Sequence, residues 1–200
     1  MVDLRVIDDP ESAGVALNPV RSRILSELRT PASAASLAGR MGLARQKVNY
    51  HLRTLEEHGL LRVDSKKHWG GLTERRLVAT ASSYVVSPSA LGPVAADPSQ
   101  DMDRLSAGYL VALAARVIRE VGQLLRKSEK LNKRLATLSI DTEVRFRSAE
   151  DRAAFSKDLT AAVAALVSRY HDESAPGGRR HRLMIGAYPT PVAAKGKETT

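Results

Sequence analysis

Hydrophobic side chains recur at helical spacing in three successive segments in the first third of the chain. The first segment begins at Asn18-Pro19, a typical helix start, because Asn caps a helix and Pro fits its first position. The second segment is short and ends at Gly42, which provides a turn. The third ends at Gly59 and carries an apolar stripe formed by Val48, Leu52 and Leu55. The pattern predicts three helices that share one core.

The other face of the third segment is polar from its first turn. Arginine pairs with guanine, glutamine and asparagine pair with adenine, and lysine pairs with guanine or phosphate. A short helix, a glycine-containing turn and a second helix with such a leading face form a helix-turn-helix unit. A solvated polar face is the alternative interpretation, and the flanking sequence favours a DNA-reading helix. The residues predicted to contact base edges are Arg45, Gln46, Asn49 and Tyr50.

Period-two alternation follows this helix and predicts a β-hairpin. Its strands cover residues 60–67 and 73–80, and residues 68–72 form the tip. Such a hairpin is a wing whose cations reach phosphates or a minor groove. Trp69 either inserts beside the sugar-phosphate backbone or packs on the hairpin. The residues predicted to contact phosphates or the groove beside the wing are Arg21, Lys47, Arg53, Lys66, Lys67, Trp69, Arg75 and Arg76.

Residues 18–80 resemble the winged helix-turn-helix of the ArsR-type bacterial transcription regulators. The resemblance rests on the order and spacing of four motifs: Asn18-Pro19-Val20-Arg21-Ser22-Arg23-Ile24-Leu25, Leu37-Ala38 with Met41-Gly42-Leu43, Val48-Asn49-Tyr50-His51-Leu52 with Leu55 and Gly59-Leu60-Leu61, and Glu74-Arg75-Arg76. It implies a dimeric, DNA-binding repressor or activator. One departure is Ala44, which stands where such helices often carry a Ser or Thr cap. The missing cap costs the helix about 1 kcal/mol.

The second half begins with a proline-rich linker over residues 82–101, in which Tyr84-Val85-Val86 form either a brief strand or an anchor on the wing domain. A long helix over residues 102–136 follows. Apolar residues of this helix follow a heptad seam, which favours a copy of the same helix in a second subunit over packing within the chain. The residues predicted to line the dimer are Leu113, Val117, Val121, Leu124, Leu131 and Leu135.

Residues 137–188 predict a βαβ unit with a right-handed crossover, in which alternating strands flank an amphipathic helix that starts near Ser148. Residues 1–17 are expected to form an N-terminal arm, residues 18–81 the winged helix-turn-helix, and residues 189–200 a disordered tail. The predicted fold class is α+β, mainly α with small β.

Charge is concentrated on the predicted DNA-binding module. The formal net charge of the chain is +9; residues 18–80 hold 12 Lys and Arg against 5 Asp and Glu, so +7 of it lies there. Phosphate binding needs such a field. The chain contains no cysteine, which excludes disulfides, thiol catalysis and thiolate metal sites. No apolar run indicates a signal peptide or a membrane span, so a cytoplasmic protein is expected, associated with the nucleoid when bound to DNA.

Candidate metal ligands and catalytic residues are few outside the predicted DNA-binding module. His171, Asp172, Glu173 and His181 cluster near one loop, where they either bind Zn²⁺ or Ni²⁺ or form a solvated polar loop; the second interpretation is favoured. We therefore expect no metal and no cofactor. The sequence contains no glycine-rich phosphate loop, no nucleophile elbow and no paired carboxylates, so we expect no enzyme.

The leading functional hypothesis is a homodimeric, sequence-specific transcriptional regulator that binds double-stranded DNA. A second hypothesis adds a small-molecule effector, an apolar molecule held between the long helix and the βαβ layer. Two alternatives remain open: a winged-helix protein-interaction module and a sequence-blind architectural DNA-binding protein.

Overall fold

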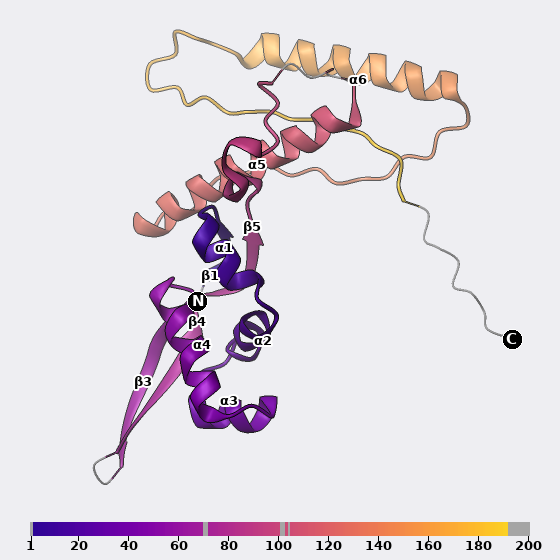
Figure 1. The fold of residues 1–200 in the computed structure, drawn as a ribbon. Coiled ribbons are helices and arrows are strands. Elements are labelled where there is room, and N and C mark those ends of the chain that lie inside the picture. Colours follow the sequence, from indigo (N-terminus) through magenta and orange to yellow (C-terminus); the bar gives the residue numbers. More distant parts are fainter. Residues whose placement is uncertain (1, 70–71, 101–102, 104, 192–200) are drawn as a thin grey trace, which may run out of the picture. The chain divides into compact units, whose positions relative to one another are not determined.

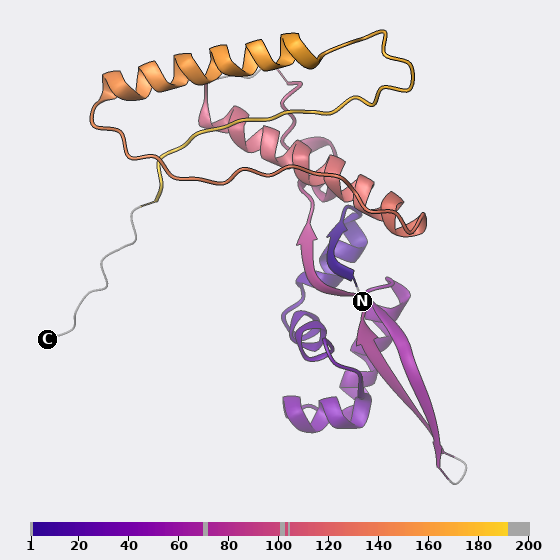
Figure 2. The same cartoon turned by 180° about the vertical axis from the view of Figure 1, so that it is seen from behind.

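The computed structural model describes residues 2–69, 72–100, 103 and 105–191 (Figures 1 and 2). The chain divides into two compact units, Met1–Leu135 and Ala136–Thr200. Helices and small sheets are mixed, as expected for the predicted α+β class. None of the described helices is long and apolar enough to cross a membrane.

The first unit contains four short α-helices, and local signals set where three of them begin. Pro10 and Pro19 occupy the first helical positions, where a missing N–H costs nothing. The side chain of Asn18 accepts hydrogen bonds from the next helix's first-turn amides, as the sequence predicted. Ala44 makes no such bond, which confirms the missing cap. These helices are α1 (Pro10–Leu17), α2 (Pro19–Glu27), α3 (Ala34–Met41) and α4 (Arg45–Glu57).

The predicted wing is present as an antiparallel hairpin of β3 (Leu61–Trp69) and β4 (Leu72–Ala79). A short strand, β2 (Ala32–Ser33), pairs with β4 and completes a three-stranded sheet in the order β2-β4-β3. The hairpin projects away from the helices of its unit (Figures 1 and 2). Its tip, residues 70–71, and the side chain of Trp69 lie outside the described part of the chain.

Two elements differ from the predicted arm and linker. β1 (Val2–Ile7) lies in the expected arm, residues 1–17, and pairs in parallel with β5 (Ala81–Val86), most of which lies in the expected linker, residues 82–101. β5 includes Tyr84-Val85-Val86, where a brief strand was one of the two predictions. The 3-10 helix η1 (Pro88–Val94) follows. The Arg5 side chain reaches the carbonyl of Gly59 and lies 3.1 Å from the Thr80 hydroxyl, which fixes β1 to the end of α4. Both segments therefore belong to the folded unit.

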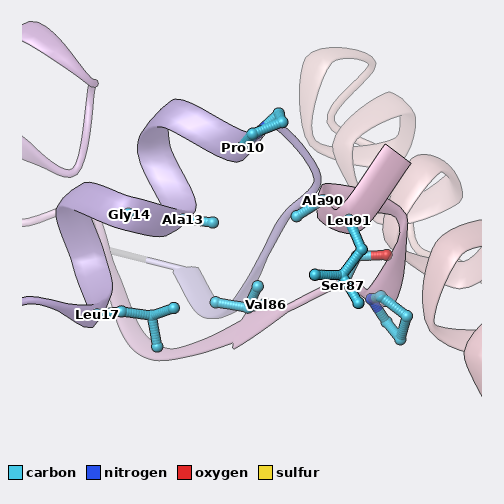
Figure 3. Close-up of a pocket in the computed structure, with 9 residues that line it drawn as sticks. Pro10, Ala13, Gly14, Leu17, Val86, Ser87, Ala90 and Leu91 are labelled. Atoms are coloured by element: carbon cyan, nitrogen blue, oxygen red, sulfur yellow. The ribbon is translucent and has the colours of Figure 1, made fainter. Parts of the chain in front are cut away.

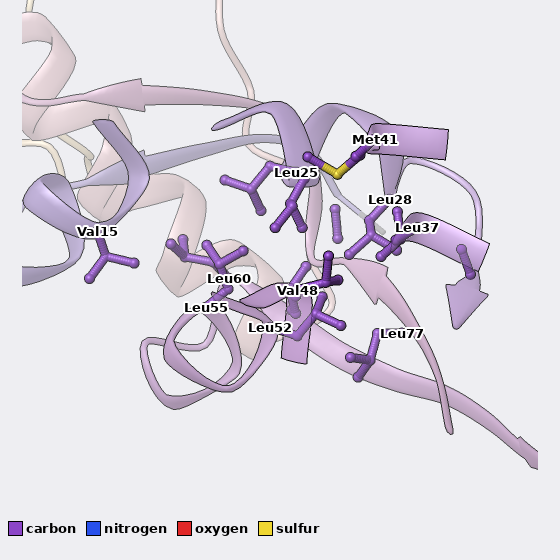
Figure 4. Close-up of a cluster of buried hydrophobic side chains, with 14 of the residues drawn as sticks. Val15, Leu25, Leu28, Leu37, Met41, Val48, Leu52, Leu55, Leu60 and Leu77 are labelled. Carbon is purple, nitrogen blue, oxygen red and sulfur yellow. The ribbon is translucent and has the colours of Figure 1, made fainter. Parts of the chain in front are cut away.

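One apolar core joins the helices to the sheet (Figure 4). Val48, Leu52 and Leu55 are buried, which confirms the predicted inner face of α4. The fully buried large side chains come from successive segments of the chain, so these segments share one core. They include Ile24, Leu28, Leu37, Leu55 and Leu60.

The long helix α5 (Ala107–Lys130) is shorter than the predicted 102–136 span, since Ser106 caps its start and Leu131 its end. Its buried residues are small: Ala112, Ala115 and Gly122. Gly122 packs against Val6 of β1 so closely that an added Cβ would require a shift of one of the two segments. Consequently the large residues of the predicted heptad seam are not the ones buried within this chain. Leu124 and Leu131 remain about half exposed.

The second unit contains one helix, α6 (Ala149–Tyr170), capped by Ser148 as the sequence predicted. Neither flanking strand of the predicted βαβ unit (137–188) is formed in the described residues 136–191. Two strands are only marginally stable without a third strand or a covering layer, and α6 buries none of its residues. Leu138 and Ile140, expected in the first strand, are more than four-fifths exposed. Residues 192–200 of the expected tail lie outside the described residues.

Candidate nucleic-acid interface

The helix-turn-helix is formed by α3, a tight turn and α4. Gly42 ends α3 with a left-handed backbone (φ 65°), which glycine adopts without strain. The amide of Leu43 donates to the Ala38 carbonyl at 3.1 Å and closes the turn. Gly59 ends α4 in the same way (φ 64°). The turn residues named from the sequence therefore set the turn inside the unit, at Gly42, and its C-terminal end, at Gly59.

The exposed face of α4 is polar, and its buried face is apolar except for His51. The four buried positions, Val48, His51, Leu52 and Leu55, lie on the core side. Because Ala44 supplies no cap, the first-turn N–H groups of α4 are open to an external acceptor, and a helix N-terminus attracts phosphate. Tyr50 is 63% exposed although it is large and aromatic. The exposed polar residues on this helix are Arg45, Gln46, Lys47, Asn49, Tyr50 and Arg53.

The wing carries two kinds of cation. Lys66 and Lys67 are exposed, and they stand opposite Arg75 and Glu74 in the hairpin. Arg75 forms an ion pair of 2.6 Å with Glu56 of α4, which ties the wing to the end of that helix. This pair joins residues 19 apart in sequence, and no sequence signal foretold it.

Two other predicted phosphate ligands serve the fold. The guanidinium of Arg76 donates to the Pro31 carbonyl at 2.7 Å and holds β4 beside the segment before α3. Arg21 donates through Nε to the Val15 carbonyl at 2.7 Å and holds α2 against the end of α1. Together with Arg75, these arginines set the positions of the elements that carry the exposed polar residues.

His51 lies under the exposed face of α4 and is only 7% exposed. Neither of its ring nitrogens has a hydrogen-bond partner among the described residues, and its ring stands edge-on to Tyr50 with centroids 5.3 Å apart. Desolvation lowers the pKa of His51, and the charges of Arg21 and Lys47 lower it further. The ring is therefore neutral at neutral pH.

The histidine-containing loop of the second unit shows local contacts. Glu173 pairs with His171 at 3.4 Å and contacts Arg180. The Nδ1 of His181 lies 2.9 Å from the Arg179 carbonyl oxygen. In the described residues, no three His, Asp or Glu side chains gather closely enough to hold a metal ion.

Comparison with known families gives one match. Residues 16–64 match a family model described as a helix-turn-helix domain. No curated protein matches the chain. The matched span runs from the end of α1 into β3 and includes the α3–α4 pair. Residues 16–64 of this chain are therefore similar, in sequence and in the structure they form, to a helix-turn-helix domain.

Proposed function

We propose that this chain is a sequence-specific, DNA-binding transcriptional regulator. The observation that carries the proposal is α4, whose leading face presents guanidinium, amide, ammonium and phenol groups to solvent while its other face is fixed in the core. An α-helix fits the major groove of DNA, where such groups distinguish base pairs. The helix-turn-helix match over residues 16–64 supports the same function.

Charge supports a nucleic-acid partner. Residues 18–80 carry a formal charge of +7, and the remaining 19 cations are nearly balanced by 17 acids. Cations on a DNA-binding surface release counterions from phosphates, which supplies much of the affinity. A protein-interaction module has no need for this asymmetry.

We assign roles by exposure. Arg45, Gln46, Asn49 and Tyr50 contact base edges from the exposed leading face of α4. The exposed cations that contact phosphates are Lys47 and Arg53 on α4 and Lys66 and Lys67 on the wing. Trp69 belongs to the wing contact as well. We assign Arg21, Arg75 and Arg76 a supporting part, because each already has an acceptor within the chain.

We further propose an ArsR-type bacterial regulator that acts as a cytoplasmic homodimer through α5. Leu124 and Leu131 are 48% and 56% exposed and are available for a second copy. Together with them, the seam comprises Leu113, Val117, Val121 and Leu135. Two copies of α4 would enter successive major grooves about 34 Å apart and read a near-palindromic site.

Selection of bound sequences from a random duplex library at physiological salt tests the proposal. Arg45→Ala and Gln46→Ala should each relax specificity by about 1–3 kcal/mol at one base pair. Lys67→Ala should weaken all sequences equally and reduce the salt slope by about 0.9. Arg152→Ala, an exposed arginine of α6, is the matched control and should change neither property.

Three results would contradict the proposal in different ways. An Arg45→Ala variant with unchanged affinity and base preference would show that α4 does not enter the groove. Salt-sensitive binding without any selected sequence would indicate an architectural protein. Absence of DNA binding at low salt would favour a winged helix that binds another protein.

A further inference from the structure

A groove separate from the α4 surface lies between α1, the end of β5 and η1 (Figure 3). Its volume is about 420 Å³, within the range of small-molecule sites in proteins. Ala13, Gly14 and Leu17 of α1 form one wall, and Val86, Ala90 and Leu91 form the other.

The chemistry of the lining indicates the class of ligand. None of the residues that line the groove carries an ionisable side chain. Its one hydroxyl, that of Ser87, is fully buried and already lies 2.7 Å from the hydroxyl of Ser89. Leu17 and Leu91 are 67% and 64% exposed at the rim. A ligand here gains free energy by covering apolar surface, and a charged ligand would find no counter-charge.

Helix α1, which forms one wall of the groove, also contacts the C-terminal end of α4. Ser12 of α1 directly precedes Ala13 of the groove wall. The Oγ of Ser12 lies 3.3 Å from Nδ1 of His58, the C-cap of α4. Val15 of α1 is buried in the common core, and its carbonyl accepts the 2.7 Å hydrogen bond from Arg21. A ligand that moves α1 therefore acts on α2 and on the end of α4 through direct contacts.

We infer that this groove binds an uncharged, apolar small molecule and that its occupancy changes DNA binding. The first part stands on the groove alone, and the second part rests on the proposed function. This places the effector in the first unit and not between the long helix and the second unit.

Gly14 allows a sharp test because it lines the groove and an added Cβ there meets nothing within 4 Å. The Cβ of a leucine at this position therefore meets no steric clash, and we expect the rest of the Gly14→Leu side chain to obstruct the groove. Gly39→Leu is the matched control, since Gly39 lies in α3 with the same open space and outside the groove. Leu91→Asp, which adds a charge at the exposed rim, is a second variant, and Leu105→Asp, at a 95% exposed leucine, is its control.

The probe is N-phenyl-1-naphthylamine, an uncharged aromatic amine that fluoresces in apolar surroundings, titrated into the full chain. Wild type and both controls should bind it saturably, and Gly14→Leu and Leu91→Asp should bind at least ten-fold more weakly. Saturating probe should change the affinity of wild type for its selected duplex about five-fold or more, and that of Gly14→Leu not at all.

Equal binding by all variants, or no saturable binding by wild type, would overturn the groove as a ligand site. If Gly14→Leu instead dissociates an oligomer in sedimentation experiments, a second copy of the chain covers the groove and the inference is wrong. Probe binding without an effect on DNA affinity would overturn the coupling. Probe binding is measured without DNA. It therefore still tests whether the groove binds a ligand if the proposed DNA-binding function is wrong.

Discussion

Replacing Gly122 with alanine tests how α5 is held against β1. An added Cβ would lie 2.8, 2.9 and 3.0 Å from the Cβ, Cγ1 and Cγ2 atoms of Val6, all shorter than ordinary carbon contacts. Both residues are buried, and β1 is fixed on its other side by pairing with β5. The clash must therefore be relieved by a shift of α5.

Two opposing terms set the magnitude. Alanine in place of a helical glycine gains about 1 kcal/mol of helix propensity. Overpacking a buried contact by one carbon costs about 1–3 kcal/mol. Gly122→Ala should therefore range from neutral to destabilised by about 2 kcal/mol. Gly39→Ala, where the added Cβ meets nothing within 4 Å, should be stabilised by about 1 kcal/mol.

Urea unfolding followed by circular dichroism, at one protein concentration, gives the difference between the two variants. Hydrogen exchange of residues 107–130 reports in addition whether α5 is less protected in Gly122→Ala. We expect the two variants to differ by about 1–3 kcal/mol, with faster exchange in α5. Equal stabilisation of both variants, with unchanged exchange in α5, would refute the packing described for Gly122.

Three further predictions concern the first unit. Burial lowers the pKa of His51, so below about pH 6.5 the unfolded chain binds more protons than the folded chain. The contribution of His51 to stability should therefore be full above that pH and should fall as pH decreases. Thermal melts at a series of pH values should show a smaller pH dependence in His51→Leu than in wild type. Asn18→Ala removes the cap of α2 and should lower the free energy of unfolding by about 1 kcal/mol in urea titrations, an expectation that an unchanged midpoint would contradict. The Tyr84 hydroxyl donates to the Leu60 carbonyl at 3.0 Å, so Tyr84→Phe should cost about 1–3 kcal/mol by the same assay, and a loss below experimental error would mean that water replaces the bond.

Local signals in the sequence were enough to predict the elements of the helix-turn-helix and the wing. Asn18-Pro19, Gly42 and Gly59 act within a few residues of their own position, so their effects are visible without knowledge of the fold. The apolar stripe of α4 predicted three of its four buried residues, and the burial of His51 was not predicted. The assignment of Arg45 and its neighbours to bases remains a prediction.

Contacts between distant segments were not predictable in this way. Val6 and Ile7, at the end of β1, are buried, and they can be recognised as strand residues only once their parallel pairing with β5 is known. In α5 the heptad pattern predicted contacts by large residues such as Leu124. The structure instead buries Gly122, because α5 approaches β1 closely there. The alternation before α6 satisfies the pattern of a strand, but the described residues offer it no partner strand.

The parallel pairing of β1 with β5 has a consequence for how the protein folds as it is synthesised. About 80 residues separate each residue of β1 from its partner, from Val2 and Ala81 to Ile7 and Val86. At a translation rate of about 5–20 residues per second, β1 waits roughly 4–16 s before β5 exists. During that time the helix-turn-helix between them can already form its local contacts. β1 thus leaves the ribosome before the other described strands but is among the last of them to be paired, and its apolar residues stay uncovered by β5 until then.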